Sequence, residues 1–551
     1  MKEVYIDIME KSLSAYTDER IRDYIDEVKL RGLKEHGFPR LTADIGILIS
    51  FGRRSELLPV FLEMMDICCE QMPRVKAAND FTVREICCLL MLLEERKTVN
   101  NDLIFKWKKA MAGFEPWECY TCIAKTPDTP TGNWAAFAGV SDFIRGKYCG
   151  IDTSKFVDWE ISSQMMSFDE NGMYKDPNNP MVYDFVTRLL MSVLLHFGYN
   201  GRFKEKIKEN LCKSADLTQK MQSVTGEIPF GGRSNQFINN EAHFACVCEY
   251  YASFFNKKGD ADKAGEFKAA AKMAQEAIIR WLDSEPKSHI KNKYAIDSQI
   301  GCEGYGYFNK YMITVASFAY VAYLLADDSI EPTAAVAEKG GYIAGTGEDF
   351  HKIFLNCGGY FAEIDTDADF HYDANGLGRI QKKGCHSALC LSVPFPAGDI
   401  KYKTEKENMR PMSICCYVKK DGITFYGSES YARYKLKSYC ESPELVEAEI
   451  ECKISENICI THKYVVGADG VEMSLSGYDN CGFMLPAFAF DGNKASEILT
   501  DKDSITVKFG GNTCKYIFDG EIQDEPQMYY NRNGRYKVFA VDAKKVKIEM
   551  N

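Results

Sequence analysis

The periodicity of the apolar residues changes once along this chain of 551 residues, and that change constrains the fold more than any other feature. Up to about residue 327 apolar residues recur at intervals of three and four, as in amphipathic helices. Beyond residue 345 they alternate with polar residues, and DG, NG and GG pairs mark tight turns, as in β-hairpins. We therefore predict a helical domain over residues 1–327, a linker over 328–345 and a β domain over 346–551.

The two parts predict different architectures. The first contains roughly a dozen segments of helical length joined by short loops, which favours paired helices stacked into an α/α toroid. The second has regular turn signals over about 200 residues, which favours a β-sandwich. We predict an α+β multidomain fold, with an N-terminal (α/α) toroid followed by a C-terminal antiparallel β-sandwich.

The net charge excludes some classes of partner. A formal charge of −12 argues against a nucleic-acid-binding or membrane-binding surface, because phosphate binding needs positive charge. An anionic substrate would need locally placed arginines. The most apolar stretch, residues 86–93, is far shorter than the ~20 residues that cross a bilayer, and no secretory signal is recognisable at the start. We expect a cytoplasmic protein; the sequence leaves the oligomeric state open, and a homo-oligomer is compatible with it.

The 21 cysteines form no recognisable framework. Cys119 and Cys122 make one CxxC pair, but no second pair follows at the spacing of a zinc ribbon. Such scattered cysteines are typical of buried thiols in a reducing compartment. We therefore predict no structural disulfide and no metal site. The sequence also lacks the P-loop, HExxH, EF-hand and GxSxG motifs, so it offers no signature of nucleotide, zincin or α/β-hydrolase chemistry.

The string GGRSNQFINNEAHF at residues 231–244 is the most unusual in the chain. A helix start explains its later part as cap and first-turn acid. It does not explain a cation and several amides together, which indicate a recognition site for a polar, anionic ligand. The candidate substrate-binding residues are Arg233, Asn235, Gln236 and Asn240, and the candidate catalytic residues are Glu241 and His243.

Two helix starts in the toroid are further candidates. Asn133 and Trp134 follow a loop rich in Pro, Gly and Thr, where Asn is either a plain helix cap or an amide that hydrogen-bonds a carboxylate. Tyr183 stands in the first turn of another predicted helix, beside the aromatic loop of residues 168–180. A tyrosine at an apolar position is either a core residue or part of a site, and the residues alone leave both open.

Two more segments combine aromatic and ionisable residues. Around residues 301–307 glycines alternate with Glu303, Tyr305 and Tyr307; they either shape a platform for a sugar or pack the last helix of the toroid. Early in the β part, HYDANGLGR contains His371 and Arg379. A histidine with a pKa of ~6.5 among acidic and aromatic residues suits proton transfer, and a surface histidine is the alternative.

A toroid before a β-sandwich, with GNW, a DENGMYKDPNNPMVYDF loop and helix, and a histidine early in the β part, resembles the heparinase II/III-like and oligoalginate polysaccharide lyases. The resemblance implies β-elimination on a uronic-acid-containing glycan without a cofactor. It places Asn133 as the amide that neutralises the carboxylate, Tyr183 as the catalytic tyrosine and His371 as the histidine from the sandwich. We expect the active site where the two domains meet, and exo-action on short, imported oligosaccharides.

Two other classes of function stay open at this point. A glycoside hydrolase acting on uronic-acid-containing or unsaturated sugars would need two carboxylates about 5–9.5 Å apart. A glycan-binding protein without catalysis would need neither, because a fold does not fix a function. The candidate acids for hydrolysis are Asp158, Glu160, Asp184, Glu241 and Glu303.

Overall fold

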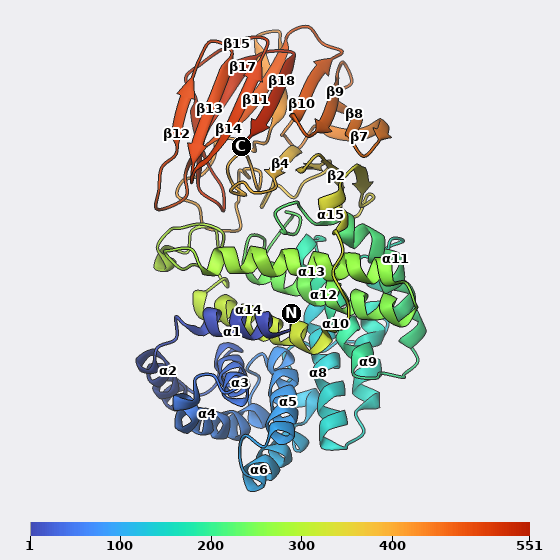
Figure 1. Ribbon diagram of the computed structural model, residues 1–551, viewed down its shortest axis with the longest axis vertical. Helices are drawn as coiled ribbons and strands as arrows, with labels where there is room; N and C mark the ends of the chain where they lie inside the picture. The colour runs from blue at the N-terminus through green and yellow to red at the C-terminus, as the bar shows by residue number, and fades with distance from the viewer. Residues whose placement is uncertain (1) are drawn as a thin grey trace.

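The computed structural model describes residues 2–551, with helices in the first part of the chain and strands in the second (Figure 1). The predicted fold class, a helical N-terminal region followed by antiparallel β-sheets, is confirmed. The α-helices are α1 (Glu3–Leu13), α2 (Asp18–Arg31), α3 (Gly37–Ser50), α4 (Leu58–Gln71), α5 (Asn79–Arg96), α6 (Asn101–Ala112), α7 (Pro116–Cys119), α8 (Asn133–Cys149), α9 (Ser154–Gln164), α10 (Met181–His196), α11 (Lys204–Met221), α12 (Asn239–Lys257), α13 (Ala261–Leu282), α14 (Phe308–Leu325) and α15 (Val336–Lys339).

Six inner helices form a closed ring. In the order α3, α5, α8, α10, α12 and α14 each contacts the next, and α14 returns to contact α3. Outer helices such as α4, α6, α9, α11 and α13 pack behind them. The inner helices are apolar nearly all round because they are covered on every side, as α10 and α14 illustrate. The few polar side chains that they bury therefore need partners or a function.

The strands within residues 2–551 form three antiparallel sheets. The four-stranded sheet has the order β1 (Tyr342–Gly345), β2 (Lys352–Cys357), β3 (Tyr360–Asp365) and β4 (Gly376–Lys382). The eight-stranded sheet has the order β12 (Glu497–Thr500), β13 (Ser504–Phe509), β14 (Asn512–Phe518), β18 (Lys545–Met550), β10 (Gly470–Ser476), β9 (Ile458–Gly467), β8 (Leu445–Ser455) and β7 (Arg433–Glu441). The six-stranded sheet has the order β15 (Glu521–Ile522), β17 (Arg535–Asp542), β11 (Cys481–Phe490), β5 (Cys415–Lys420) and β6 (Ile423–Tyr426), with β16 (Gln527–Tyr530) also paired to β17.

The four-stranded sheet is a layer between the ring and the two larger sheets, as Figure 1 shows for β2 and β4. Because side chains alternate along a strand, its two faces join two cores. Phe354 and Phe361 belong to the helical core, whereas Ile353 and Leu355 belong to the core of the sandwich. The four-stranded sheet therefore joins the β part to the helical ring, because one face packs on each.

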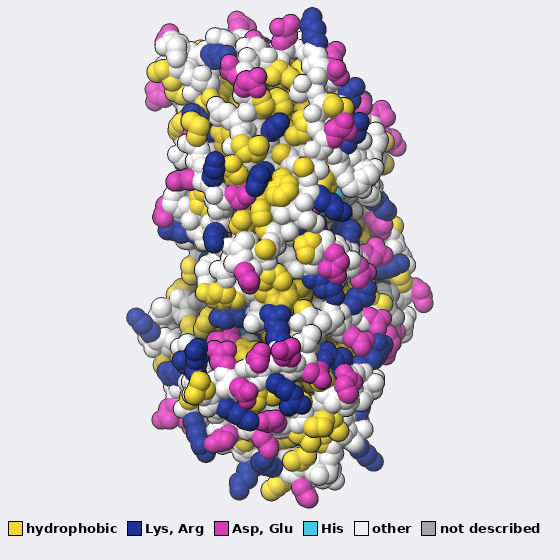
Figure 2. All heavy atoms as spheres, turned by 90° about the vertical axis from the view of Figure 1, so that its left-hand side faces the viewer, with side chains coloured by type: hydrophobic (Ala, Val, Ile, Leu, Met, Phe, Trp, Pro, Cys, Tyr) yellow, Lys and Arg dark blue, Asp and Glu magenta, His cyan; other side chains and the backbone are white. Residues whose placement is uncertain are grey.

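The surface is charged with both signs. On the face in Figure 2, acidic and basic side chains lie interspersed over the helical half. Within residues 2–551, no helix is both long and apolar enough to cross a membrane.

Candidate active site

A cavity of about 590 Å³ lies at one mouth of the helical ring. Every inner helix lines the cavity with side chains from its N-terminal half. One lining residue from each helix, in chain order, is Arg40, Phe81, Asn133, Tyr183, His243 and Thr314. Helix N-termini carry partial positive charge and free N–H groups. Six of them directed at one space favour an anionic ligand.

The charged side chains that line the cavity strengthen this preference. Five are cationic and two are acidic, although the whole chain carries −12. The cations are Lys34, Arg40, Lys76, Arg233 and Lys310, and the acids are Glu35 and Asp176. The locally placed arginines that an anionic substrate requires are therefore present. The cavity is cationic, so it favours anions although the protein as a whole carries a negative charge.

A chain of hydroxyl groups runs along one wall of the cavity. The Tyr183 hydroxyl lies 2.8 Å from Ser234 Oγ, and Ser234 Oγ lies 2.9 Å from the Tyr305 hydroxyl. The Arg233 guanidinium lies over the Tyr183 ring, 4.6 Å from its centroid. Burial raises the pKa of Tyr183, while the Ser234 hydrogen bond and the charge of Arg233 lower it. Burial is the largest of these effects, and the two neighbours partly oppose it.

Asp176 holds the two groups next to Tyr183 that can bind a carboxylate. Its Oδ1 accepts hydrogen bonds from the backbone N–H of Asn133 at 2.8 Å and from Asn133 Nδ2 at 3.1 Å. Its Oδ2 pairs with the Arg233 guanidinium. Asp176 is fully buried, whereas Arg233 retains 23% exposure. The carboxylate thus fixes an amide and a cation at the edge of one space.

The loop that carries Arg233 and Ser234 has an unusual backbone. Gly231 and Gly232 have φ of 146° and 72°, and Ser234 and Gln236 have φ of 60° and 66°. At Gly232 a Cβ would lie 2.8 Å from Pro180 Cβ, so the loop passes too close to the start of α10 for a side chain. Two non-glycine residues in the left-handed region need strong support from their surroundings.

That support comes from the amides that the sequence suggested as substrate-binding residues. Asn235 Nδ2 donates to the Pro229 carbonyl at 3.1 Å, and Asn240 Nδ2 donates to the Ser234 carbonyl at 3.1 Å. Gln236 Nε2 donates to Asn235 Oδ1 at 2.6 Å. All three side chains are buried and none lines the cavity. Within residues 2–551 they hold the loop instead of reaching into the cavity, because Asn235 and Asn240 donate to the loop's backbone and Gln236 donates to the Asn235 side chain.

The β part braces the same loop from behind. Asp373 Oδ2 accepts a hydrogen bond from Gly232 N at 2.7 Å. Arg532 pairs with Glu303 Oε1 at 2.6 Å. The same oxygen also accepts a hydrogen bond from Ser234 N at 2.6 Å. The cavity is nevertheless lined by the helical part alone, since no described lining residue lies beyond Phe318. This cavity is therefore a pocket in the ring supported by the β part, and not the cleft between two domains that the sequence predicted.

His371 lies away from this pocket. It is exposed on the loop before β4, and its Nδ1 faces the Asp399 carbonyl at 3.0 Å. The segment around it folds so that Asp373, two residues on, reaches the loop of Arg233. Tyr307 is also outside the cavity, exposed beside Lys310, whose Nζ lies 5.5 Å from its ring. The structure therefore brings neither residue to Tyr183.

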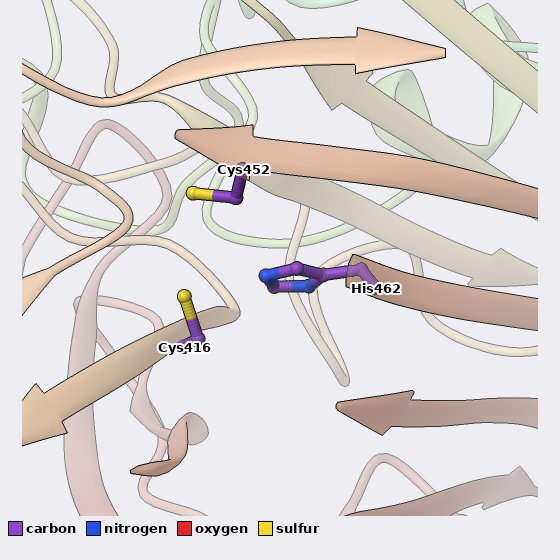
Figure 3. A group of neighbouring side chains, drawn as sticks. All are labelled: Cys416, Cys452 and His462. Atoms are coloured by element: carbon purple, nitrogen blue, oxygen red, sulfur yellow. The ribbon is translucent and has the colours of Figure 1, made fainter. Parts of the chain in front are cut away.

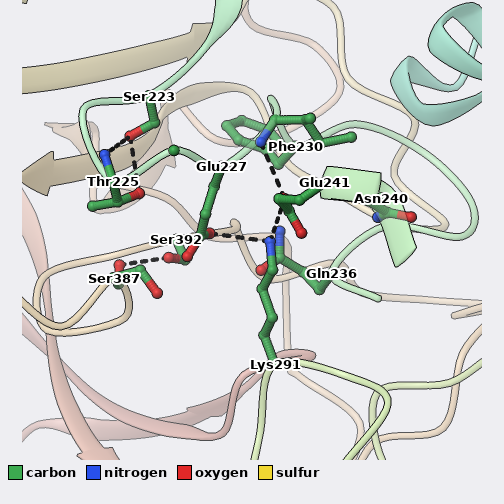
Figure 4. Close-up of polar contacts among 12 residues, drawn as sticks. Ser223, Thr225, Glu227, Phe230, Gln236, Asn240, Glu241, Lys291, Ser387 and Ser392 are labelled. Carbon is green, nitrogen blue, oxygen red and sulfur yellow. Dashed lines mark hydrogen bonds and ion pairs between the residues drawn. The ribbon is translucent and has the colours of Figure 1, made fainter. Parts of the chain in front are cut away.

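Glu241 belongs to a buried polar network with Lys291 and Glu227 (Figure 4), and Arg379 is buried on the β side, where it donates to the Ile228 carbonyl at 2.6 Å. Lys291 Nζ lies 2.8 Å from Glu241 and 3.2 Å from Glu227. Arg379 is fully buried and pairs with Glu363 at 3.2 Å. Charges inside a protein need such partners. The predicted roles of Glu241 as a catalytic residue and Arg379 as a substrate contact are not supported by these positions.

The floor of the cavity has polar atoms without partners. Arg40 donates to Glu85 and Thr314, but its Nη2 has no hydrogen-bond partner within residues 2–551. The same holds for Asn239 Oδ1 and His243 Nδ1, which lie one turn apart on α12. Burial, with Arg40 nearby, lowers the pKa of His243 to about 3, so this imidazole is neutral at physiological pH. A polar ligand in the cavity would satisfy these atoms.

Of the residues suggested by the sequence, the cavity brings together Asn133, Trp134, Tyr183, Arg233, His243 and Tyr305. Sequence reasoning missed Asp176, Ser234 and Arg40. Arg40 had a signal, because it interrupts an otherwise apolar helical segment, GFPRLTADIGILIS. Asp176 had none, since an acid in a turn-rich DPNNP loop is ordinary.

No family model matches the sequence, and no curated protein is similar to it in sequence. Solved structures similar to the chain include the xanthan lyase of Paenibacillus, with 9% identity and a TM-score of 0.48 over 94% of this chain and 54% of that one. A heparan sulfate lyase from Pedobacter heparinus has 10% identity and a TM-score of 0.41 over 92% and 72% of the chains. A chondroitinase AC lyase has 11% identity and a TM-score of 0.42 over 100% and 82%. This chain thus spans about half the length of the xanthan lyase that it matches.

Proposed function

We propose that the protein is a lyase that cleaves uronic-acid-containing oligosaccharides by β-elimination. The observation that carries the proposal is the placement of the Tyr183 hydroxyl in a cation-rich cavity, beside an arginine and an amide held by one buried carboxylate. Each of these groups matches one requirement of the reaction. No cofactor is needed for any step.

The elimination begins with the proton on C5 of the uronic acid, which is acidic only when the neighbouring carboxylate is neutralised. Arg233 and Asn133 would bind that carboxylate and stabilise the charge that develops on it. Tyr183, as its phenolate, would take the C5 proton; the electron pair forms the C4–C5 double bond and the C4–O4 bond breaks. The same hydroxyl then returns the proton to the leaving O4 oxygen. Positioned proton transfer of this kind contributes ~10²–10⁴-fold.

Hydrolysis by paired carboxylates is less well supported. None of the five candidate acids lines the cavity: Asp184 pairs with Arg188, Glu303 with Arg532 and Glu241 with Lys291. Glu160 accepts a hydrogen bond from Ala124 N, and Asp158 accepts one from Tyr199. Of the two acids that do line it, Asp176 is engaged by Arg233 and Asn133, and Glu35 by Tyr24 and Gly37 N.

The shape of the cavity favours short chains. Beyond Arg40, His243 and Phe318 the ring is filled by buried side chains, both apolar residues and the Arg84–Glu85 ion pair, so the cavity is closed at that end. A volume of about 590 Å³ falls in the range of pockets that enclose small ligands. Trp134, 37% exposed and edge-on to Phe81 at 4.7 Å, offers an aromatic face at the rim for a sugar ring. We therefore propose attack at a chain end.

The test uses a panel of oligosaccharides built on different uronic acids. A lyase produces a 4,5-unsaturated sugar that absorbs in the near ultraviolet, and it incorporates no oxygen from labelled water. We expect Tyr183→Phe to lose ~10²–10⁴-fold in turnover. Tyr307→Phe is the matched control, because this tyrosine is exposed outside the cavity, and it should keep full activity.

Three results would count against the proposal. Full turnover by Tyr183→Phe removes the tyrosine from the mechanism. A saturated product carrying labelled oxygen identifies a hydrolase. Binding of uronic-acid oligosaccharides without turnover of any of them would make the protein a glycan-binding protein.

A further inference from the structure

The interior of the β-sandwich brings together three metal-ligating side chains far from the cavity (Figure 3). Cys416 lies on β5 of the six-stranded sheet, whereas Cys452 lies on β8 and His462 on β9 of the eight-stranded sheet. One ligand atom from each lies within 4.8 Å of the others, and all three side chains are buried. The cluster therefore connects the two sheets through the core.

His462 is out of place in that core unless something binds it. It points inward from β9, between the buried Ile460 and Tyr464. Its Nδ1 lies 3.2 Å from the Tyr464 hydroxyl. Its Nε2 has no hydrogen-bond partner within residues 2–551, and the side chain is only 1% exposed. Buried ring nitrogens are nearly always partnered.

A second buried polar group without a partner lies at the same place. Tyr434 on β7 is directly opposite Cys452 in the strand register, so both side chains leave the sheet on the same face. Its ring centroid is 5.7 Å from that of His462. In the described chain, the Tyr434 hydroxyl also has no hydrogen-bond partner. Two such atoms beside two thiols indicate a ligand.

We propose that Cys416, Cys452 and His462 bind a structural Zn²⁺ ion that joins the two sheets. Thiolate and imidazole are the ligands that zinc prefers, at about 2.3 Å from sulfur and 2.0–2.1 Å from nitrogen in a tetrahedron. Ligand atoms on such an ion lie about 3.3–3.8 Å apart, so the cluster closes onto zinc with shifts of at most about 1 Å. Both thiols lose a proton when the ion binds. Tyr434, whose ring centroid is 5.7 Å from that of His462, is the candidate for the fourth position.

The sequence predicted no metal site because these residues share no motif. Cys416 belongs to an adjacent cysteine pair, and Cys452 and His462 lie on consecutive strands without the spacing of a zinc finger. Only the pairing of β8 with β9, and the packing of β5 over them, brings the three together. None of the three lines the cavity, so the ion has a structural role and not a catalytic one.

The experiment measures metal in the full chain, purified without a histidine tag or chelator and under reducing conditions. Elemental mass spectrometry of the acid-digested protein should find about one zinc ion per chain. His462→Ala and Cys452→Ser should lose most of it. Cys514→Ser is the matched control, because Cys514 is another buried cysteine of the eight-stranded sheet outside the cluster, and it should keep the full content.

If the variants do not fold, the unmodified chain decides. After removal of metal by a chelator, addition of Zn²⁺ should raise the melting temperature, and Co²⁺ should give a thiolate-to-cobalt absorption band. Failure of the reduced chain to bind either ion would overturn the proposal. So would a folded His462→Ala variant with undiminished zinc, binding of Cu⁺ but not Zn²⁺, or a disulfide between Cys416 and Cys452 in the freshly purified protein.

Discussion

Replacing Asp176 by asparagine tests how the candidate site is organised. The carboxamide keeps one oxygen, which can still accept the two hydrogen bonds from Asn133. Its NH₂ group takes the position of Oδ2 and therefore faces the Arg233 guanidinium, donor against donor. The change removes one charge and leaves the shape of the side chain almost intact. We expect Arg233 to leave its position while Asn133 stays.

The size of the effect follows from the burial of the pair. Removing one partner of a fully buried ion pair costs about 3–5 kcal/mol of stability. Arg233 is 23% exposed and can turn to water, so the free energy of unfolding should fall by less, about 1–3 kcal/mol. For turnover, the loss of a positioned group that stabilises developing charge costs about 10²–10³ in kcat. Activity should therefore fall far more than stability.

A double-mutant cycle with Arg233→Ala gives the decisive assay. If Asp176 acts by holding Arg233, each single variant removes the same interaction with substrate, and the double variant should be no slower than Arg233→Ala. Glu405→Gln is the control, since it removes a carboxylate from the Arg535 ion pair outside the cavity. If the loss of kcat in the double variant equals the product of the two single losses to within about twofold, the two residues act independently and the reasoning is refuted.

Two further predictions concern pKa values. Ser234→Ala removes a hydrogen bond that lowers the pKa of Tyr183, so the pH at which kcat/KM rises should move to a higher value, measured as a pH–rate profile. Burial raises the pKa of Glu160 from 4.5 to about 8. Between these two pH values the acid stays protonated in the folded protein but ionises in the unfolded chain. The free energy of unfolding therefore falls as the pH rises from 4.5 to 8. Glu160→Gln should therefore be more stable than the unmodified protein at pH 8, by at most ~5 kcal/mol, and equal to it at pH 4 in denaturant titrations.

The architecture followed from periodicity, because burial of one helix face or one strand face leaves a regular pattern in the sequence. The site followed only in part. Tyr183 and Asn133 stand at helix starts, and helix starts in a ring meet at its mouth, so their positions could be predicted. Asn235 and Gln236 could not be assigned, because a polar residue in a loop either binds a ligand or holds the loop itself, and only coordinates separate the two.

The β part controls the cavity without lining it. Arg532, in the turn between β16 and β17, pairs with Glu303 of the ring. Glu303 accepts the hydrogen bond from Ser234 N, and the Ser234 hydroxyl is hydrogen-bonded to Tyr183. Three contacts thus connect a turn of the sandwich to the hydroxyl proposed to move the proton. A shift of the β part against the ring that moved Glu303 would also disturb Ser234, one of the two groups that lower the pKa of Tyr183. The proposed chemistry therefore depends on both parts of the chain, although the substrate would contact only the ring.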